Sequence, residues 1–155
     1  MRSRRALQIC DLLEALADDL PQRAAPKWRD TQRQCHTVLR PHFLFLSDLV
    51  FPVLLTRTKG EVDRQELLLR LRCDCSDQVH ALSDLDELLS DAFLVERFAN
   101  EPESLGFALR GHFEALRRDL YWERDVLWPL AARTLTARDV ATLDRAMRGV
   151  TVDAP

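Results

Sequence analysis

The sequence contains few of the residues that interrupt helices or favour strands. Its 155 residues include only 4 Gly, 7 Pro and 1 Tyr. A turn-rich β-sandwich uses more glycine and more β-branched and aromatic residues, so this composition favours helices. Charged residues make up 30% of the chain and hydrophobic residues 46%, which is typical of a folded protein rather than a disordered one. The length fits a single domain with its own core.

Positive charge is also limited, which bears on the partners of the protein. Lys27 and Lys59 are the only lysines, the remaining basic residues are arginines, and the net charge is −3. Proteins that bind nucleic acids present a basic face to the phosphates, and no segment of this chain supplies one. We therefore expect no nucleic-acid partner.

Neither an export signal nor a membrane span is evident in the sequence. Asp11 and Glu14 interrupt what would be the apolar core of a signal peptide after the basic residues near the N-terminus. The most apolar run, residues 42–55, contains Asp48 and is shorter than the roughly 20 residues needed to cross a bilayer. The sequence predicts a cytoplasmic protein without membrane contact. Its cysteines are then expected to be reduced, as packed thiols or metal ligands: Cys10, Cys35, Cys73 and Cys75.

Apolar residues recur at steps of three and four over most of the chain, which predicts amphipathic helices. A capping-box pattern from Thr136 to Asp139 opens the last of them, which ends at Gly149. Short connections favour antiparallel neighbours, so we expect an all-α, antiparallel up-and-down four-helix bundle with a short fifth helix at one end. The domain covers residues 1–150, and residues 151–155 form a frayed tail. The expected helices span residues 4–20, 27–56, 62–99, 102–133 and 137–149.

Local residues mark the breaks and faces of these helices. Pro41 should kink the second helix or start a new segment of it, Gly60 lies in the break that follows it, and Pro102 is placed at the first position of the fourth. On the third helix, Cys75 and Gln78 interrupt an otherwise regular apolar face.

Polar residues interrupt the apolar faces of these helices and indicate a metal site. Asp119 and Glu123 are four residues apart, with His112 seven residues before Asp119, so all three can share one helical stripe. Two buried carboxylates repel each other, and a cation between them or a proton on one of them would relieve the cost. The alternative is a stripe shifted by one position, with Leu120 and Leu127 inside and the carboxylates near solvent.

Three further residues could contribute to such a site from other helices. Cys10, His42 and Cys75 occupy inward positions, and with Glu123 they would supply one group from each long helix. Thiolates with imidazole favour zinc over iron. The alternative assigns His42 to a hydrogen-bonded core and the cysteines to small apolar packing. Three other residues are interpreted as structural or solvent-facing: Cys35, His36 and His80.

A repeated segment resembles the signature of hemerythrin-like, or HHE cation-binding, domains. The segment HFLFLSDLVFP runs from His42 to Pro52, and DLYWERDVLWP runs from Asp119 to Pro129 at the same position of the fourth helix. The resemblance implies a helical bundle in which His and Glu side chains of these segments bind iron. Here Leu46 stands at the family's Glu position in the first segment and Asp119 at its His position in the second. Only His42 and Glu123 match by type.

The resemblance therefore implies an altered, degenerate metal site. We expect a sensing, regulatory or interaction module rather than an oxygen carrier. We expect no enzyme, since phosphate loops, nucleophile elbows and His-Glu-x-x-His helices are missing. The metal ligands would be His42, Asp119, Glu123, His112, Cys10 and Cys75, holding one iron or zinc ion or none. The alternatives are a mononuclear metalloprotein of redox or nitrosative-stress response, and a protein partner or homodimer formed through Trp122 and Trp128.

Overall fold

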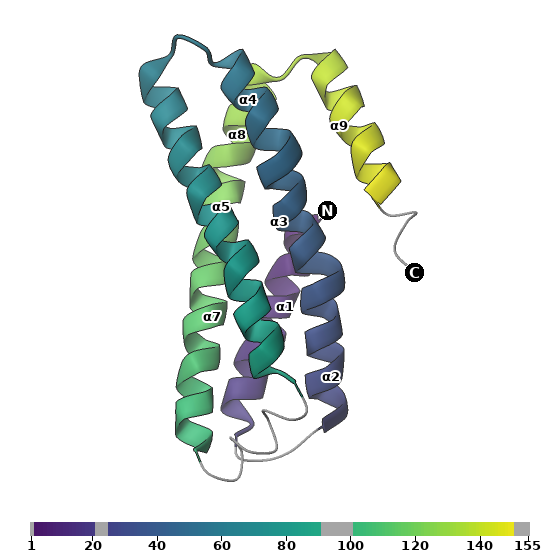
Figure 1. Ribbon diagram of the computed structural model, residues 1–155, viewed down its shortest axis with the longest axis vertical. Helices are drawn as coiled ribbons and strands as arrows, with labels where there is room; N and C mark the ends of the chain where they lie inside the picture. Colours follow the sequence, from purple (N-terminus) through teal and green to yellow (C-terminus); the bar gives the residue numbers. More distant parts are fainter. Residues whose placement is uncertain (1, 21–24, 91–100, 151–155) are drawn as a thin grey trace.

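The protein is all-helical, as the sequence predicts. The computed structural model describes residues 2–20, 25–90 and 101–150, and these ranges contain no strand. Figure 1 shows long helical rods lying side by side, with one shorter helix standing off at one end. The predicted tail at residues 151–155 and the predicted helical stretch at residues 91–99 lie outside the described residues.

The rods follow the predicted helices closely. The first is α1 (Arg2–Asp18), the third is α5 (Val62–Leu88) and the last is α9 (Ala137–Val150). Two rods combine α-helix with short π-helical turns, in which the backbone bonds span five residues instead of four. The second rod consists of α2 (Ala25–Gln34), η1 (Cys35–Leu39), α3 (Arg40–Phe45), η2 (Leu46–Val50) and α4 (Phe51–Arg57). The fourth consists of α7 (Pro102–Trp122), η3 (Glu123–Leu127) and α8 (Trp128–Thr134).

The rods end and begin where their local sequence requires. Gly60 has a φ of 93°, a left-handed conformation that a side chain disfavours, and it separates α4 from α5. Pro102 occupies the first turn of α7, where its missing N–H is not needed. Thr136 and Asp139 form the predicted capping box: the Asp139 N–H donates to the Thr136 hydroxyl over 3.2 Å, and the Thr136 N–H donates to Asp139 Oδ2 over 2.9 Å.

Each π-helical turn ends two residues before a proline inside a rod. The N–H of Arg40, before Pro41, donates to the carbonyl five residues earlier, and the residues before Pro52 and Pro129 do the same. A proline in a regular α-helix lacks an N–H and clashes with the carbonyl four residues before it. The extra residue of the π turn shifts that register, so the helix continues through each proline. Pro41 was expected to kink or restart its helix, and the π turn is how the chain passes it.

The core lies between the rods, and its residues test the predicted faces. α1 packs mainly against α7, and α5 packs against α3 and α4. The predicted face of α5 is confirmed, including the buried polar Gln78. The predicted face of the fourth rod is partly wrong: His112 and Asp119 are only partly covered, whereas Leu120 and Leu127 are buried. Glu123 is buried on that same face, so the shifted alternative is right for the leucines and wrong for this acid.

The second rod is long and apolar enough to cross a membrane. The helix is continuous over 31 residues from Lys27 to Arg57, because the π turns allow it to continue through its prolines. The prediction considered only residues 42–55 and therefore underestimated its length. Core helices of soluble proteins satisfy the same criteria of length and composition. One side of this rod supplies fully buried core residues, among them Leu39, Phe43 and Leu54.

Candidate functional site

A histidine and a glutamate from two different rods pair inside the core. His42 Nε2 lies 2.8 Å from Glu123 Oε2 and 3.0 Å from Oε1. The two residues are 2% and 6% exposed. Burying either group alone would be costly, and the bidentate contact compensates for the lost water. His42 also places its ring edge-on to Phe43, with the centroids 5.2 Å apart.

The local backbone explains why these two side chains meet. In each segment a π turn begins at the fifth residue, η2 at Leu46 and η3 at Glu123, and His42 lies one turn before η2. The two segments noted for their resemblance thus have the same backbone, a π turn followed by a proline, and they face each other across the core. Leu46 occupies the position of the first segment that corresponds to Glu123 in the second, and Asp119 occupies the position that corresponds to His42. Both residues line a cavity beside the His42–Glu123 pair. Leu46 cannot hydrogen-bond, so only one of the two possible polar pairs forms.

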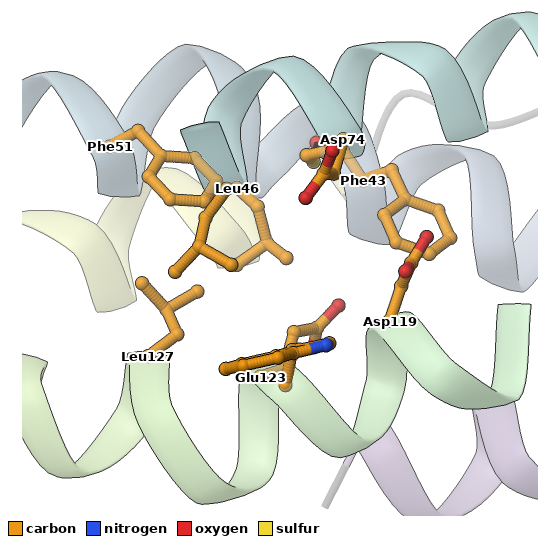
Figure 2. Close-up of a pocket in the computed structure, with 10 residues that line it drawn as sticks. Phe43, Leu46, Phe51, Asp74, Asp119, Glu123 and Leu127 are labelled. Carbon is orange, nitrogen blue, oxygen red and sulfur yellow. Dashed lines mark hydrogen bonds between the residues drawn. The ribbon is translucent and has the colours of Figure 1, made fainter. Parts of the chain in front are cut away.

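Asp119 bonds to a different partner. Gln78 on α5 donates from its Nε2 to Asp119 Oδ2, and Arg118 Nε donates to Oδ1 over 3.3 Å. Burial raises the pKa of Asp119, and the hydrogen bond from Gln78 and the charge of Arg118 partly oppose that shift. Figure 2 shows the Asp119 and Glu123 side chains rising from one rod into a space that Leu46 and Phe43 approach from the other side. This cavity measures about 20 Å³, room for about one water molecule.

Cys75 lies at the same cavity and contacts the backbone of the second rod. Its thiol donates to the Phe43 carbonyl over 3.3 Å, and the Ser47 N–H bonds to its sulfur. Burial, together with the nearby Glu123 and Asp119 carboxylates, raises the pKa of Cys75 to about 12. A thiol held in its protonated form beside a helix backbone acts as a hydrogen-bonding core residue.

The remaining predicted ligands lie elsewhere. Cys10 is completely buried in α1, and its charged neighbours are Arg117, Asp11 and Glu14 rather than the His42–Glu123 pair. Its electrostatic partner among the thiols is Cys35, which is buried, so the structural alternative for Cys35 is right and the solvent-facing one is wrong. His112 is half-buried near Asp84, and burial lowers its pKa. His36 and His80 are exposed, as expected.

The donor set around the pair does not fit a metal centre. Across the part of the chain that the structure describes, no group of three or more His, Cys, Asp or Glu side chains is arranged to hold an ion. In the same part, every buried side-chain nitrogen and oxygen has a hydrogen-bond partner. A bound metal needs three or four ligands with free lone pairs. Here both carboxylate oxygens of Glu123 already face the imidazole of His42.

The sequence missed two participants in this region. Gln78 was recognised only as a polar interruption of the α5 face, and its bond to Asp119 required knowing which rods are neighbours. The Phe43 carbonyl bonds to Cys75, a contact no side-chain pattern reveals. No family model, curated protein or solved structure matches this chain.

Proposed function

We propose that the protein is a cytoplasmic sensing, regulatory or interaction module without catalytic activity. Its architecture would be an antiparallel up-and-down four-helix bundle similar to hemerythrin-like domains, with α9 as the fifth helix. In this proposal the His42–Glu123 pair fills the interior position that iron occupies in that family. The protein then keeps the shape of the bundle and works through its surfaces.

The observation that carries the proposal is the bidentate contact between His42 and Glu123. It uses the two residues that match the family's ligands by type, and it leaves neither free. Leu46 removes a carboxylate from the same cavity, and Asp119 bonds to Gln78. Each of the four positions is thus an apolar residue or is engaged with another protein group, which supports a fold that is complete without an ion.

Metal analysis together with thermal unfolding tests the proposal. The protein is purified without chelators, assayed for iron and zinc, and unfolded with EDTA, with added Zn²⁺ and with added Fe²⁺. We expect substoichiometric metal and an unchanged melting temperature in all three conditions, because an ion that binds only the folded state would raise it.

Metal that depends on the core histidine would overturn the proposal. One equivalent of iron or zinc, lost in a folded His42→Gln variant and retained in His80→Gln, would instead establish a mononuclear metalloprotein. His80 is an exposed histidine that bonds to the backbone of its own helix, so its replacement controls for adventitious surface binding. Circular dichroism of both variants shows whether they remain folded.

A further inference from the structure

An apolar cavity lies beside α9. It measures about 360 Å³ and lies between α9, the region around η2 and α8. Figure 1 shows α9 standing apart from the long rods. We call it the α9 groove. Phe45 and Trp128 form part of the wall on the rods, and Val140, Leu143 and Met147 form the wall on α9.

Polar contacts at one end hold α9 in this position. Asp139, in the first turn of α9, accepts two hydrogen bonds from the Arg57 guanidinium, over 2.9 Å and 2.8 Å. The same carboxylate caps the helix through Thr136. Further along α9, Leu143 is 9% exposed and belongs to the hydrophobic core, whereas Val140 is 53% exposed. Asp139 and Leu143 therefore attach α9 to the rods, whereas the apolar side chain of Val140 remains exposed.

The lining determines which ligands suit the groove. Among the described residues that line it, Asp144 is the one ionisable side chain and the others are apolar. Ligand sites of about 300–1,000 Å³ with mainly apolar walls are typical for small molecules. A cavity of about 150 Å³ holds benzene, so this groove has room for about two aromatic rings. Asp144 is ion-paired with Arg148 on the same helix, so the lining offers no uncompensated charge to an ionic ligand and mainly apolar contacts to an uncharged one.

The size of the groove also disfavours a protein partner as its main occupant. Stable protein interfaces bury about 1,200 Å² or more in total. A cavity of this volume accepts only one or two large side chains. We propose that the α9 groove binds a small, uncharged, apolar molecule of about two rings. This ligand site is separate from the His42–Glu123 pair and does not depend on whether that pair binds metal.

Titration with 6-propionyl-2-(dimethylamino)naphthalene, an uncharged two-ring dye, tests the proposal on the full chain. Its fluorescence rises in apolar surroundings, and we expect a saturable rise with one site per chain. The negatively charged dye 8-anilinonaphthalene-1-sulfonate should bind more weakly, because the apolar lining supplies no uncompensated positive charge to replace the water around its sulfonate. Near-ultraviolet circular dichroism must show fixed packing, since loosely packed states also bind such dyes.

Two substitutions of the same kind locate the binding. Ala132 lines the groove, whereas Ala141 is an exposed residue of α9 that does not line it. We expect Ala132→Phe to weaken dye binding by about tenfold or more by filling the groove, and Ala141→Phe to leave it unchanged. A second pair, Val140→Glu and Ala141→Glu, places a charge inside or outside the groove without disturbing buried residues.

Three results would overturn the proposal. They are the absence of saturable binding to the folded protein, equal binding by both members of each variant pair, and a stable dimer in sedimentation that dissociates in Ala132→Phe. The last result would assign the groove to a second copy of the chain. A metal-binding result at His42 would leave the dye experiment unaffected, so the two proposals fail independently.

Discussion

His42 and Glu123 are 81 positions apart in the sequence and satisfy each other in the interior, with Nε2 2.8 Å from the nearer carboxylate oxygen. The contact joins the second rod to the fourth at the centre of both. Because each partner is nearly inaccessible to water, removing one leaves the other buried without its principal hydrogen-bond partner. The free energy of unfolding should therefore fall more when one of the two residues is replaced than when both are.

Replacing one partner should be more damaging than replacing both. We expect Glu123→Leu to lower the free energy of unfolding by about 3 kcal/mol or more, because it leaves a buried imidazole unpaired. The double variant His42→Leu/Glu123→Leu should recover much of that loss, since paired apolar groups are often as stable as a buried ion pair. Urea unfolding measures both. Glu114→Leu, at an exposed position of α7, is the control and should change little. A double variant as unstable as the sum of the single ones would contradict this account.

Asp119 should behave differently from Glu123, because its partner is an amide. Asp119→Asn keeps an oxygen that can accept from Gln78 and removes a charge that burial disfavours. The pKa of Asp119 is raised in the folded state, so its ionised form opposes folding at neutral pH. We expect the variant to be as stable as the parent or more so at pH 7. The difference should vanish as the pH falls below the pKa of an unfolded aspartate, about 3.9, where both states are protonated. A clear loss of stability at pH 7 would show that the Asp119 charge itself is needed.

The anchoring of α9 should depend on pH with the opposite sign. The Arg57 guanidinium and the Thr136 bonds hold the pKa of Asp139 well below its usual range. A lowered pKa in the folded state stabilises folding above the unfolded value of about 3.9 and loses that effect as the pH falls through the folded value. Hydrogen exchange followed by mass spectrometry should show α9 amides protected at pH 6 and faster in Asp139→Asn. The control is Asp144→Asn, which removes an α9 carboxylate that does not cap the helix. Its α9 amides should exchange more slowly than those of Asp139→Asn. Equal protection in all three proteins would refute the anchor.

Thiol reactivity should separate one cysteine from the other three. Burial raises the pKa of Cys10, Cys35 and Cys75 to about 12, whereas Cys73 is exposed. The thiolate is the reactive form. At pH 8 we expect iodoacetamide to modify one thiol quickly and the other three only after unfolding in guanidinium, by intact-mass analysis. Cys73→Ser should abolish the fast phase. Rapid modification of two or more sites in the native protein would show that a buried thiol is accessible.

The sequence predicted the helices well because their boundaries are local. The Thr136–Asp139 capping box, Pro102 and Gly60 act through neighbouring backbone groups, and each lies where it was expected. The face of α5 was also predictable, since a single uninterrupted helix keeps a regular period. The face of the fourth rod was harder because polar residues lie on both sides of the true stripe. His112 and Asp119 occupy its edge rather than its centre.

The site was less predictable than the fold. Six ligands were proposed from residue type and helical phase, and the structure brings His42 and Glu123 into direct contact. Phase along one helix says which side chains point inward, but not which rods are adjacent or at what height they meet. That is why Cys10 and Cys75 both fit an inward position and yet lie in different surroundings. The π turns could not be predicted for a related reason. The prolines indicated breaks in the helices, and the change of hydrogen-bond register that avoids these breaks involves only backbone groups.

Asp139 both starts α9 and attaches it to the second rod, which matters for anyone engineering this end of the molecule. Substituting Asp139 changes the winding of the first helical turn and the orientation of the whole helix together, so its phenotype mixes two effects. Arg57 takes part only in the second, because the Thr136 bonds do not involve it. In Arg57→Ala we therefore expect α9 to change its orientation while its first turn stays helical. This variant is a better starting point than an Asp139 substitution for a tethered sensor built on this protein.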